Sequence, residues 1–493
     1  MKDVSARFGQ LRDRLRHFHS LNTAAGLLEW DMEVLMPRAA AEARALQFSA
    51  VTKAAHEVIV AEVTGRLLEE LAPAAAAAPA DDAMAAAWRW TEREHRRRRK
   101  QPASFVEELA AHTARAQEIW AEARAKKDYA LFRPELERMV ELKRRQASFV
   151  GEFADPYDAW LEEFEPGMTT SSIERLFGEL KPGLVELVAK VSARAGSARL
   201  PELKGSFPID RQRVFGEEVA RAMGFDFERG RLDVSAHPFS AAISRDDVRL
   251  TTRYREDMPF SALFGTMHEA GHGLYEQNVS DELKHTPLCH GATMAVHESQ
   301  SRLWENLVGR SRGFWNRFTP RFQKLFPAAK GFSAEDLYRA SNRVERSFIR
   351  VEADELTYSL HVMLRFDLER ALVSGKLKAS DLPEAWAAKS KEYLGIVPPD
   401  AASGVLQDVH WSAGLLGYFP TYAVGNMISV QLFEAAPKTD DYSVLLGWLR
   451  DNVHRHGRKF GAEEIVRRAT GKPISPEPYL RYLAAKFGEI YGL

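Results

Sequence analysis

Hydrophobic residues recur at a helical period along most of the chain. Residues 105–132 (FVEELAAHTARAQEIWAEARAKKDYALF) and 337–372 (LYRASNRVERSFIRVEADELTYSLHVMLRFDLERAL) carry apolar positions every three or four residues, which predicts two long amphipathic helices. The second is expected to begin at a capping box, because Asp336 follows Ser333 by three positions. Residues 70–83 (ELAPAAAAAPADDA) contain two prolines, so they indicate a connector between helices.

The helical period fails between residues 207 and 260. Here polar and apolar residues alternate and prolines interrupt them, and residues 246–254 (DDVRLTTRY) give the best predicted strand. A short sheet therefore directly precedes residues 265–277 (GTMHEAGHGLYEQ). The pattern predicts a mostly α fold with one small β-sheet beside the helix that carries this histidine motif.

Composition narrows the classes of function. The 493 residues include 68 Lys and Arg against 69 Asp and Glu, which gives no electrostatic case for a nucleic-acid or membrane partner. The basic segment 93–102 (REHRRRRKQP) is interpreted as a solvated helical face. No apolar run of eighteen residues occurs, and residues 1–18 lack the apolar core of a secretory signal. With Cys289 as its one cysteine, interpreted as structural, the protein is expected in the cytoplasm.

The H-E-A-G-H motif carries the first chemical signal. His268 and His272 lie four residues apart, so a helix presents both imidazoles on one face to a single ion. Glu269 lies beside that face, where a general base takes a proton from an activated water. Gly271 and Gly273 each cost about 1 kcal/mol in a helix interior. We therefore expect another backbone or a ligand to approach closely there.

A chance histidine pair is the alternative, and it leaves a third ligand unexplained. A catalytic zinc site needs three protein ligands and one open position. Residues 294–310 (MAVHESQSRLWENLVGR) predict an amphipathic helix with His297 and Glu298 in its first turn. Glu298 completes a His-His-Glu set, although a carboxylate at a helix start is also favoured by the helix dipole alone.

Six short patterns now carry a resemblance to a known family. They are HPF at 237–239, DVRLT at 247–251, HEAGH at 268–272, HESQ at 297–300, IRVEAD at 349–354 and GVLQDVHW at 404–411. Their order resembles the thermostable metallocarboxypeptidase family typified by carboxypeptidase Taq. Residues 27–37 (LLEWDMEVLMP) are also similar to the family's first helix pair, so the resemblance covers nearly the whole chain.

The resemblance implies a large helical zinc-peptidase fold, saddle-like with a deep groove, often assembled as a homodimer. It implies residues 1–200 as a helical region over the groove and 201–493 as the catalytic region, the two forming one continuous unit. It also implies removal of single residues from peptide C-termini with broad preference. His268, His272 and Glu298 then bind one Zn²⁺, for which Co²⁺ can substitute, and Glu269 is the base.

Residues 404–426 supply candidates for stabilising the oxyanion. His410 is the expected donor, with Tyr422 preferred over Tyr418 as its partner, since donors aimed at developing charge contribute about 3–4 kcal/mol each. Asp408 is expected to orient an imidazole. The alternative interpretation is a helix–loop junction in which Trp411 serves as a packing anchor.

An exopeptidase must also hold the free carboxylate of its substrate. Arg350, on the predicted long helix, is the expected forked partner. Periodicity alone favours a solvated i,i+4 ladder there, and the family pattern reverses that preference. Arg249, on a strand expected at the sheet edge, is a second candidate, and that strand could pair with the substrate backbone. His237 is expected to help close the groove.

Three alternatives compete with a metallocarboxypeptidase. One is an RNA-binding protein that uses the basic segment 93–102 and would show a steep salt dependence of its RNA affinity. A zinc oligopeptidase or dipeptidyl carboxypeptidase shares the H-E-x-x-H and glutamate set, but the HESQ, IRVEAD and GVLQDVHW patterns favour the carboxypeptidase. An inactive helical scaffold is the less favoured alternative, because Glu269, the ligands and His410 are all intact.

Overall fold

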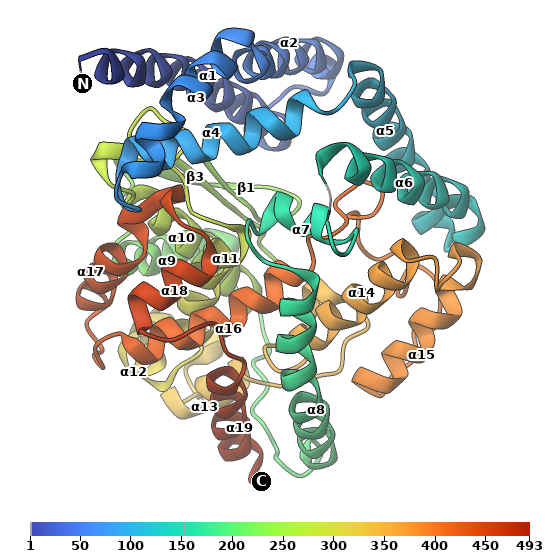
Figure 1. Cartoon of the computed structure of the whole chain (residues 1–493). Helices are drawn as coiled ribbons and strands as arrows, with labels where there is room; N and C mark the ends of the chain where they lie inside the picture. The colour runs from blue at the N-terminus through green and yellow to red at the C-terminus, as the bar shows by residue number, and fades with distance from the viewer. Residues whose placement is uncertain (1, 152) are drawn as a thin grey trace. The chain divides into compact units, whose positions relative to one another are not determined.

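The computed structural model describes residues 2–151 and 153–493, and helices dominate it (Figure 1). Contacts divide the chain into two compact units, each assembled from separate segments. Unit 1 comprises residues 1–99, 202–341 and 432–473, and unit 2 comprises residues 100–201, 342–431 and 474–493. The predicted division into residues 1–200 and 201–493 stays a prediction.

Unit 1 contains the sheet and the helices around it. Its helices are α1 (Lys2–Val34), α2 (Ala41–Val60), α3 (Glu62–Ala77), α4 (Ala83–Arg99), α9 (Ile209–Met223), α10 (Pro259–Gln277), α11 (Met294–Arg302), the π-helix η3 (Leu303–Gly309), α12 (Arg312–Leu325), α13 (Ala334–Ser341), α17 (Tyr442–Asn452) and α18 (Ala462–Thr470). Short 3-10 turns are η1 (Arg38–Ala40), η2 (Asp281–Leu283), η4 (Pro327–Ala329) and η7 (His454–Lys459). The predicted connector at 70–83 overlaps α3, which continues through Pro73 and ends at Ala77. The residues between Ala77 and α4 connect the two helices.

Unit 2 has helices and connecting segments, with no strand among its described residues. Its helices are α5 (Ala103–Lys126), α6 (Tyr129–Val150), α7 (Asp158–Phe164), α8 (Thr170–Arg194), α14 (Tyr358–Val373), α15 (Leu382–Leu394) and α19 (Glu477–Tyr491), with 3-10 turns η5 (Arg350–Glu352) and η6 (Ala379–Asp381). Helix α16 (Pro420–Ala435) begins in unit 2 and ends in unit 1. The long helix predicted over 105–132 is α5 followed by the start of α6, separated where Lys127 adopts a φ of 58°.

The sheet has three strands in the described residues, β1 (Gly230–Val234), β2 (Ser240–Ser244) and β3 (Asp247–Thr252), in the order β1-β3-β2. Strand β3 pairs parallel to β1 and antiparallel to β2, with Leu250 opposite both Leu232 and Ser240. Helix α10 follows β3 and packs against it (Figure 1). The predicted strand and its place before the histidine helix are confirmed. Its expected place at the edge is wrong, because β3 is central and β2 forms an edge.

The predicted long helix over 337–372 is also wrong in its middle. The Ser333–Asp336 capping box is present, but α13 ends at Ser341 and α14 begins at Tyr358. Between them, the Asp354 carboxylate accepts hydrogen bonds from the backbone N–H groups of Glu345, Leu356 and Thr357. A half-buried carboxylate that captures backbone donors in this way competes with helix propagation. Arg350 therefore lies on a short turn and not on a long helical face.

Each unit buries its own apolar side chains. In unit 1, Phe215 on α9 packs edge-on against Phe318 and Phe322 on α12, with ring centroids 6.0 and 5.3 Å apart. In unit 2, Phe366 on α14 contacts Tyr157 and Phe177 at 5.5 and 5.3 Å. Edge-to-face pairs of this kind add about 0.5–1.5 kcal/mol each beyond area burial. No helix in the described part of the chain combines the length and apolarity needed to cross a membrane.

Candidate metal centre

Helix α10 brings the two histidines of the motif together. The His268 and His272 rings lie 5.0 Å apart, centroid to centroid, and each Nε2 atom lies 3.5 Å from Glu298 Oε2. Glu298 projects from α11, which begins at a Thr293 side chain that accepts from the Val296 N–H. One ligand atom from each of the three side chains falls within 4.8 Å of the others. The structure thus brings together the predicted ligands from two helices.

Gly271 explains how α11 comes so close to α10. A Cβ atom at this position would lie 2.7 Å from both the Gln300 carbonyl oxygen and the Ser301 Cα. A Cβ at Gly273 would lie 2.7 Å from the Phe225 ring and 2.9 Å from Leu250 Cδ2. The expectation that another backbone approaches these glycines is confirmed at Gly271, whereas Gly273 makes room for core side chains.

Two arginines hold the carboxylates of α11 and η3 in their ionised form. Arg302 Nε donates to Glu298 Oε1 at 2.7 Å, and Arg302 and Arg310 donate to Glu305 at 3.3 and 3.1 Å. Burial opposes ionisation, but Arg302 and His268 hold the pKa of Glu298 well below its ordinary value. Arg302 likewise outweighs burial at Glu305, whose pKa falls to about 2. Because Arg302 engages Oε1, the other oxygen of Glu298 remains directed at the histidines.

Glu269 differs from these carboxylates in its environment. It is 6% exposed, and burial raises its pKa to about 7, with His268 opposing and Glu298 and Glu305 supporting the shift. A carboxyl group with a pKa near neutrality can both accept and release a proton at neutral pH. Its position next to His268 in the chain and its burial therefore suit the predicted role of general base.

A divalent cation fits the residues present. Two imidazole Nε2 atoms and one carboxylate oxygen are the donor types that zinc prefers in catalytic sites. The site also holds a proton that a cation can replace. Burial opposes a positive charge on His268, yet Glu298 and Glu305 raise its pKa to about 10. Ligand sets of this kind release protons when a metal binds. The three side chains are therefore assigned as candidate ligands.

Two carboxylates near the histidines were missed in the sequence. Glu305 on η3 accepts from His268 Nδ1 at 2.9 Å, and Glu276 on α10 contacts His297 Nε2 at 2.8 Å. Both carried a signal, since Glu305 stands seven residues after Glu298 and Glu276 four after His272, on the same helical faces. Such spacing is common on any charged helix, so it did not single them out. The π-helix that carries Glu305 belongs to a type frequent at functional sites.

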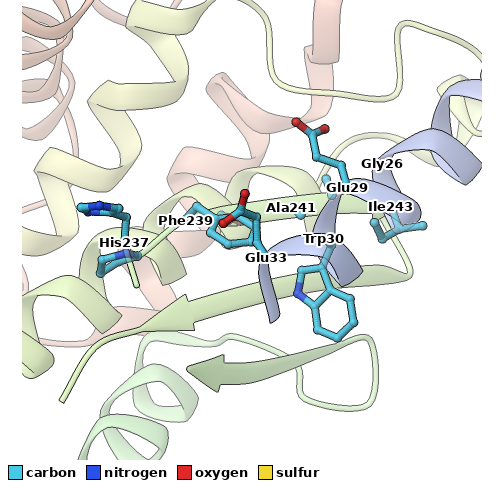
Figure 2. A pocket seen from close by; sticks show the side chains of 11 residues that line it. Gly26, Glu29, Trp30, Glu33, His237, Phe239, Ala241 and Ile243 are labelled. Carbon is cyan, nitrogen blue, oxygen red and sulfur yellow. The ribbon is translucent and has the colours of Figure 1, made fainter. Parts of the chain in front are cut away.

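A pocket of about 520 Å³ lies along β2, between this strand and α1. His237, Trp30 and Glu29 are among its lining residues, and Figure 2 shows the Glu29 carboxylate and the Trp30 indole leaving α1 in opposite directions. His237 is exposed, and its neighbour Pro238 reaches within 3.9 Å of where a Cβ would stand at Gly265, one turn before His268. The predicted residue His237 therefore lies beside the start of the motif helix.

Arg249 is engaged within the sheet. Its guanidinium donates to both oxygens of Asp247 at 2.9 Å and lies 4.3 Å from the centroid of the Trp30 ring. Because β3 is paired on both sides, it cannot accept a substrate backbone, and the edge strands of the sheet are β1 and β2. The expectation that the Arg249 strand offers that edge is therefore wrong.

Unit 2 contains the other predicted residues, in a separate polar cluster. Arg350 is 4% exposed, and its Nε and one terminal nitrogen donate to Asp408 Oδ1 at 3.0 and 2.8 Å, while the other donates to the Tyr358 hydroxyl at 2.8 Å. Asp408 Oδ2 accepts from Arg365 Nε at 2.7 Å. The expectation that Asp408 orients an imidazole is wrong, because two guanidinium groups occupy its carboxylate.

His410 and the two tyrosines border this cluster. His410 Nε2 lies 3.2 Å from the Tyr422 hydroxyl, and its ring centroid lies 5.5 Å from that of Tyr418. Burial and then Arg350 lower the pKa of His410 to about 3, so the ring is neutral. Its Nδ1 is buried without a hydrogen-bond partner among the described residues. The Arg350 guanidinium lies 4.9 Å from the Tyr422 ring centroid.

A helix that presents two histidines and a buried glutamate, with a third candidate ligand on the next helix, is typical of one class, the helical metallopeptidases. Comparisons with known proteins specify it further. A sequence model of the family described as carboxypeptidase Taq (M32) metallopeptidase matches residues 10–487. The chain therefore belongs to this family and is a metallocarboxypeptidase, a hydrolase that takes peptide substrates and uses a divalent metal ion.

Similarity to individual proteins extends over nearly the full length. The chain is 40% identical to thermostable carboxypeptidase 1 of Thermus thermophilus, covering 99% of each protein. It is 35% identical to carboxypeptidase 1 of Bacillus subtilis, covering 98% of each. The crystal structure of the M32 carboxypeptidase from Deinococcus radiodurans R1 matches with a TM-score of 0.94 at 40% identity, covering 99% of this chain and 100% of that one. The predicted family and mostly α fold class are confirmed.

Proposed function

We propose that the protein is a zinc-dependent carboxypeptidase that removes single residues from peptide C-termini with broad preference. The observation that carries this proposal is the convergence of His268 Nε2, His272 Nε2 and Glu298 Oε2 beside the buried Glu269. A divalent cation held by these atoms supplies Lewis-acid polarisation of the scissile carbonyl and makes water more acidic. Zinc suits the two imidazoles and one carboxylate, and cobalt can substitute for it.

Glu269 carries the proton in this proposal. Its carboxylate takes one proton from the attacking water as the carbon–oxygen bond forms at the peptide carbonyl. The same proton passes to the leaving amine as the carbon–nitrogen bond breaks, which returns Glu269 to its ionised form. A pKa of about 7 lets one side chain perform both transfers near neutral pH.

The residues of unit 2 have proposed roles in binding and charge stabilisation. Arg350 and Arg365 share one carboxylate, Asp408, so the cluster carries an excess of positive charge suited to an anion such as a C-terminal carboxylate. His410 and Tyr422 are proposed as donors toward developing negative charge, with Tyr418 beside them. Arg350→Lys tests the first role, because a lost fork should raise KM, and Tyr422→Phe tests the second through kcat.

The β2 edge is the proposed place for the substrate backbone. The Thr251 N–H of β3 donates to the Phe239 carbonyl at 2.9 Å. By the alternation of an antiparallel pair, the backbone groups of Phe239 and Ala241 face β3, and those of Ser240 and Ala242 face away from it. An extended peptide can pair with such an edge. His237 and Arg249 are proposed to border this position, and substitution of either should alter KM more than kcat.

We also propose that the enzyme acts in the cytoplasm as a homodimer. Sedimentation at several protein concentrations tests the dimer.

The test uses one peptide in two forms, a free C-terminal acid and its C-terminal amide, followed by mass spectrometry. Stepwise loss of single residues from the acid alone, abolished by a chelator and by Glu269→Gln, is the expected result. Loss of dipeptides or internal cleavage of the amide would instead support the oligopeptidase or dipeptidyl carboxypeptidase alternative. Absence of cleavage together with absence of bound metal would support the inactive scaffold.

A further inference from the structure

The two histidines of the metal centre are held in different ways on the side away from Glu298. His268 Nδ1 contacts a carboxylate directly, at Glu305 Oε2. His272 Nδ1 contacts a second imidazole, and that imidazole contacts a carboxylate. We infer that His297 and Glu276 are positioning residues for the metal, fixing His272 in the tautomer and orientation that leave its Nε2 available. This inference rests on the proposed ligand set His268, His272 and Glu298.

The series His272–His297–Glu276 is called the relay below, and its donors and acceptors can be assigned atom by atom. The Nδ1 atoms of His272 and His297 lie 2.5 Å apart, so one of them carries the proton and the other accepts it. A metal on His272 Nε2 leaves the proton on His272 Nδ1, which makes His297 Nδ1 the acceptor. His297 then carries its own proton on Nε2 and donates it to Glu276 Oε1 at 2.8 Å. With His272 Nε2 occupied by a cation, this arrangement satisfies every atom in the series.

Glu276 is built to remain the final acceptor. It is 3% exposed and also accepts from the Gly291 N–H at 2.8 Å and contacts His290 Nδ1 at 3.2 Å. Burial opposes its charge, but His290 and His297 hold the pKa of its carboxyl well below the ordinary value. A buried carboxylate with several donors stays ionised, and it attracts the proton of His297 Nε2.

The surrounding residues hold the His297 ring in place. A Cβ atom at position 291 would lie 2.3 Å from His297 Cδ2, so the ring fits only because this residue is Gly291. The ring centroid lies 5.4 Å from that of Tyr275 and 4.6 Å from that of His272. The Tyr275 hydroxyl accepts from the Ala292 N–H at 3.1 Å, which fixes this ring against the loop. His297 is thus confined between the loop at 291 and helix α10.

Partners of metal-bound histidines of this kind change metal affinity by about 10–100-fold when they are removed. Two substitutions at position 297 separate the two links. The Asn amide stands near the Nδ1 position and can accept from His272, whereas the Gln amide stands near the Nε2 position and can donate only to Glu276. His297→Gln therefore loses the link to the ligand, and His297→Asn keeps it while losing the link to Glu276.

The experiment measures the dissociation constant of Zn²⁺ by competition with a chromophoric chelator, using the full-length protein stripped of metal. We expect His297→Gln to raise the dissociation constant of zinc about 10–100-fold. The increase in His297→Asn should be several times smaller. His112→Gln is the matched control, since His112 is a buried histidine of unit 2 whose Nε2 lies 3.0 Å from the Glu135 carbonyl oxygen, outside the relay, and it should keep the native dissociation constant within about twofold. Thermal midpoints of the metal-free variants report any loss of folding separately.

Three outcomes overturn the inference. These are an unchanged zinc affinity in His297→Gln, equal losses in all three variants, or losses that follow the thermal midpoints of the metal-free proteins. His272→Ala keeps this test distinct from the proposed function. If that variant still binds one zinc ion with native affinity, the ligand set is wrong and the proposed function loses its metal centre. If it loses zinc while His297→Gln does not, the metal centre stands and the relay falls.

Discussion

Unit 1 and unit 2 each bury a cluster of charged side chains, and the clusters differ in which charge is in excess. In unit 1, Glu298 and Glu305 are matched by Arg302 and Arg310, and Glu269 adds a further buried carboxyl. In unit 2, Asp408 is the carboxylate shared by two guanidinium groups. One cluster is therefore short of positive charge and the other is short of negative charge.

The two imbalances are resolved by different chemistry. In unit 1, Glu298 and Glu305 overcome the burial of His268 and raise its pKa to about 10, so that a proton supplies the missing charge. A metal cation can replace that proton. In unit 2, the surplus lies on Arg350 and Arg365, which keep their protons in proteins. The comparison indicates that unit 1 is suited to a cation and unit 2 to an anion.

Glu269→Gln should have the largest effect and tests the role of the surplus carboxyl in unit 1. The amide cannot take a proton, so kcat/KM should fall by about 10²–10⁴-fold. Zinc affinity should stay within about threefold of native, because Glu269 is not among the candidate ligands. Steady-state cleavage of an unblocked peptide and zinc titration measure both. Activity retained within tenfold would place the base elsewhere.

Asp408→Asn tests the cluster in unit 2. The substitution leaves two buried guanidinium groups without a counter-charge, and breaking a buried ion pair in this way costs about 3–5 kcal/mol. The thermal midpoint should fall accordingly. Asp400→Asn is the control, since Asp400 pairs with the exposed Lys127 and exposed pairs contribute about 1 kcal/mol or less. Similar midpoints for both variants would contradict the assignment of Asp408 as the centre of a buried cluster.

Metal removal separates the two clusters. With free zinc at about 100 times its dissociation constant, binding stabilises the folded state by about 2.7 kcal/mol, which a chelator should abolish. His272→Ala should not respond to zinc or chelator, whereas Asp408→Asn should keep the full zinc-dependent shift on its lower midpoint. Differential scanning calorimetry with and without chelator measures these shifts. If Asp408→Asn loses the zinc-dependent shift of its midpoint, the two clusters do not contribute to stability independently.

The parts of the fold that could be predicted from sequence were local ones. The spacing of His268 and His272, the Ser333 capping box and the strand before α10 depend on residues close in the chain, and the structure contains all of them. The third candidate ligand required two helices. The helical period of one segment and the chemistry of zinc made Glu298 a candidate beside a helix-dipole alternative, and the family resemblance selected it. Local periodicity and ligand chemistry therefore indicated the three candidate ligands that the structure brings together.

What could not be predicted depended on contacts between distant segments. Arg350 was placed on a continuous helix because periodicity does not register that Asp354 captures backbone donors across the break. Asp408 lies two residues before His410 in sequence, but its partners are 58 and 43 residues away. The strand order that makes β3 central likewise depends on pairing with both neighbours. Such pairings leave no periodic trace in one sequence.

Gly271→Ala should have the smallest effect and tests the helix contact that creates the cluster of unit 1. The added methyl meets the α11 backbone, which cannot rotate away, so overpacking should cost about 1–3 kcal/mol. Gly447→Ala in α17 is the matched control: a Cβ there meets no described atom within 4 Å, and the helix should gain up to about 1 kcal/mol. Because α11 carries Glu298, the displacement should also weaken zinc binding in Gly271→Ala and leave it native in Gly447→Ala. Zinc affinity that survives the loss of stability would show that Glu298 tolerates movement of its helix, and the close α10–α11 approach would then serve packing alone.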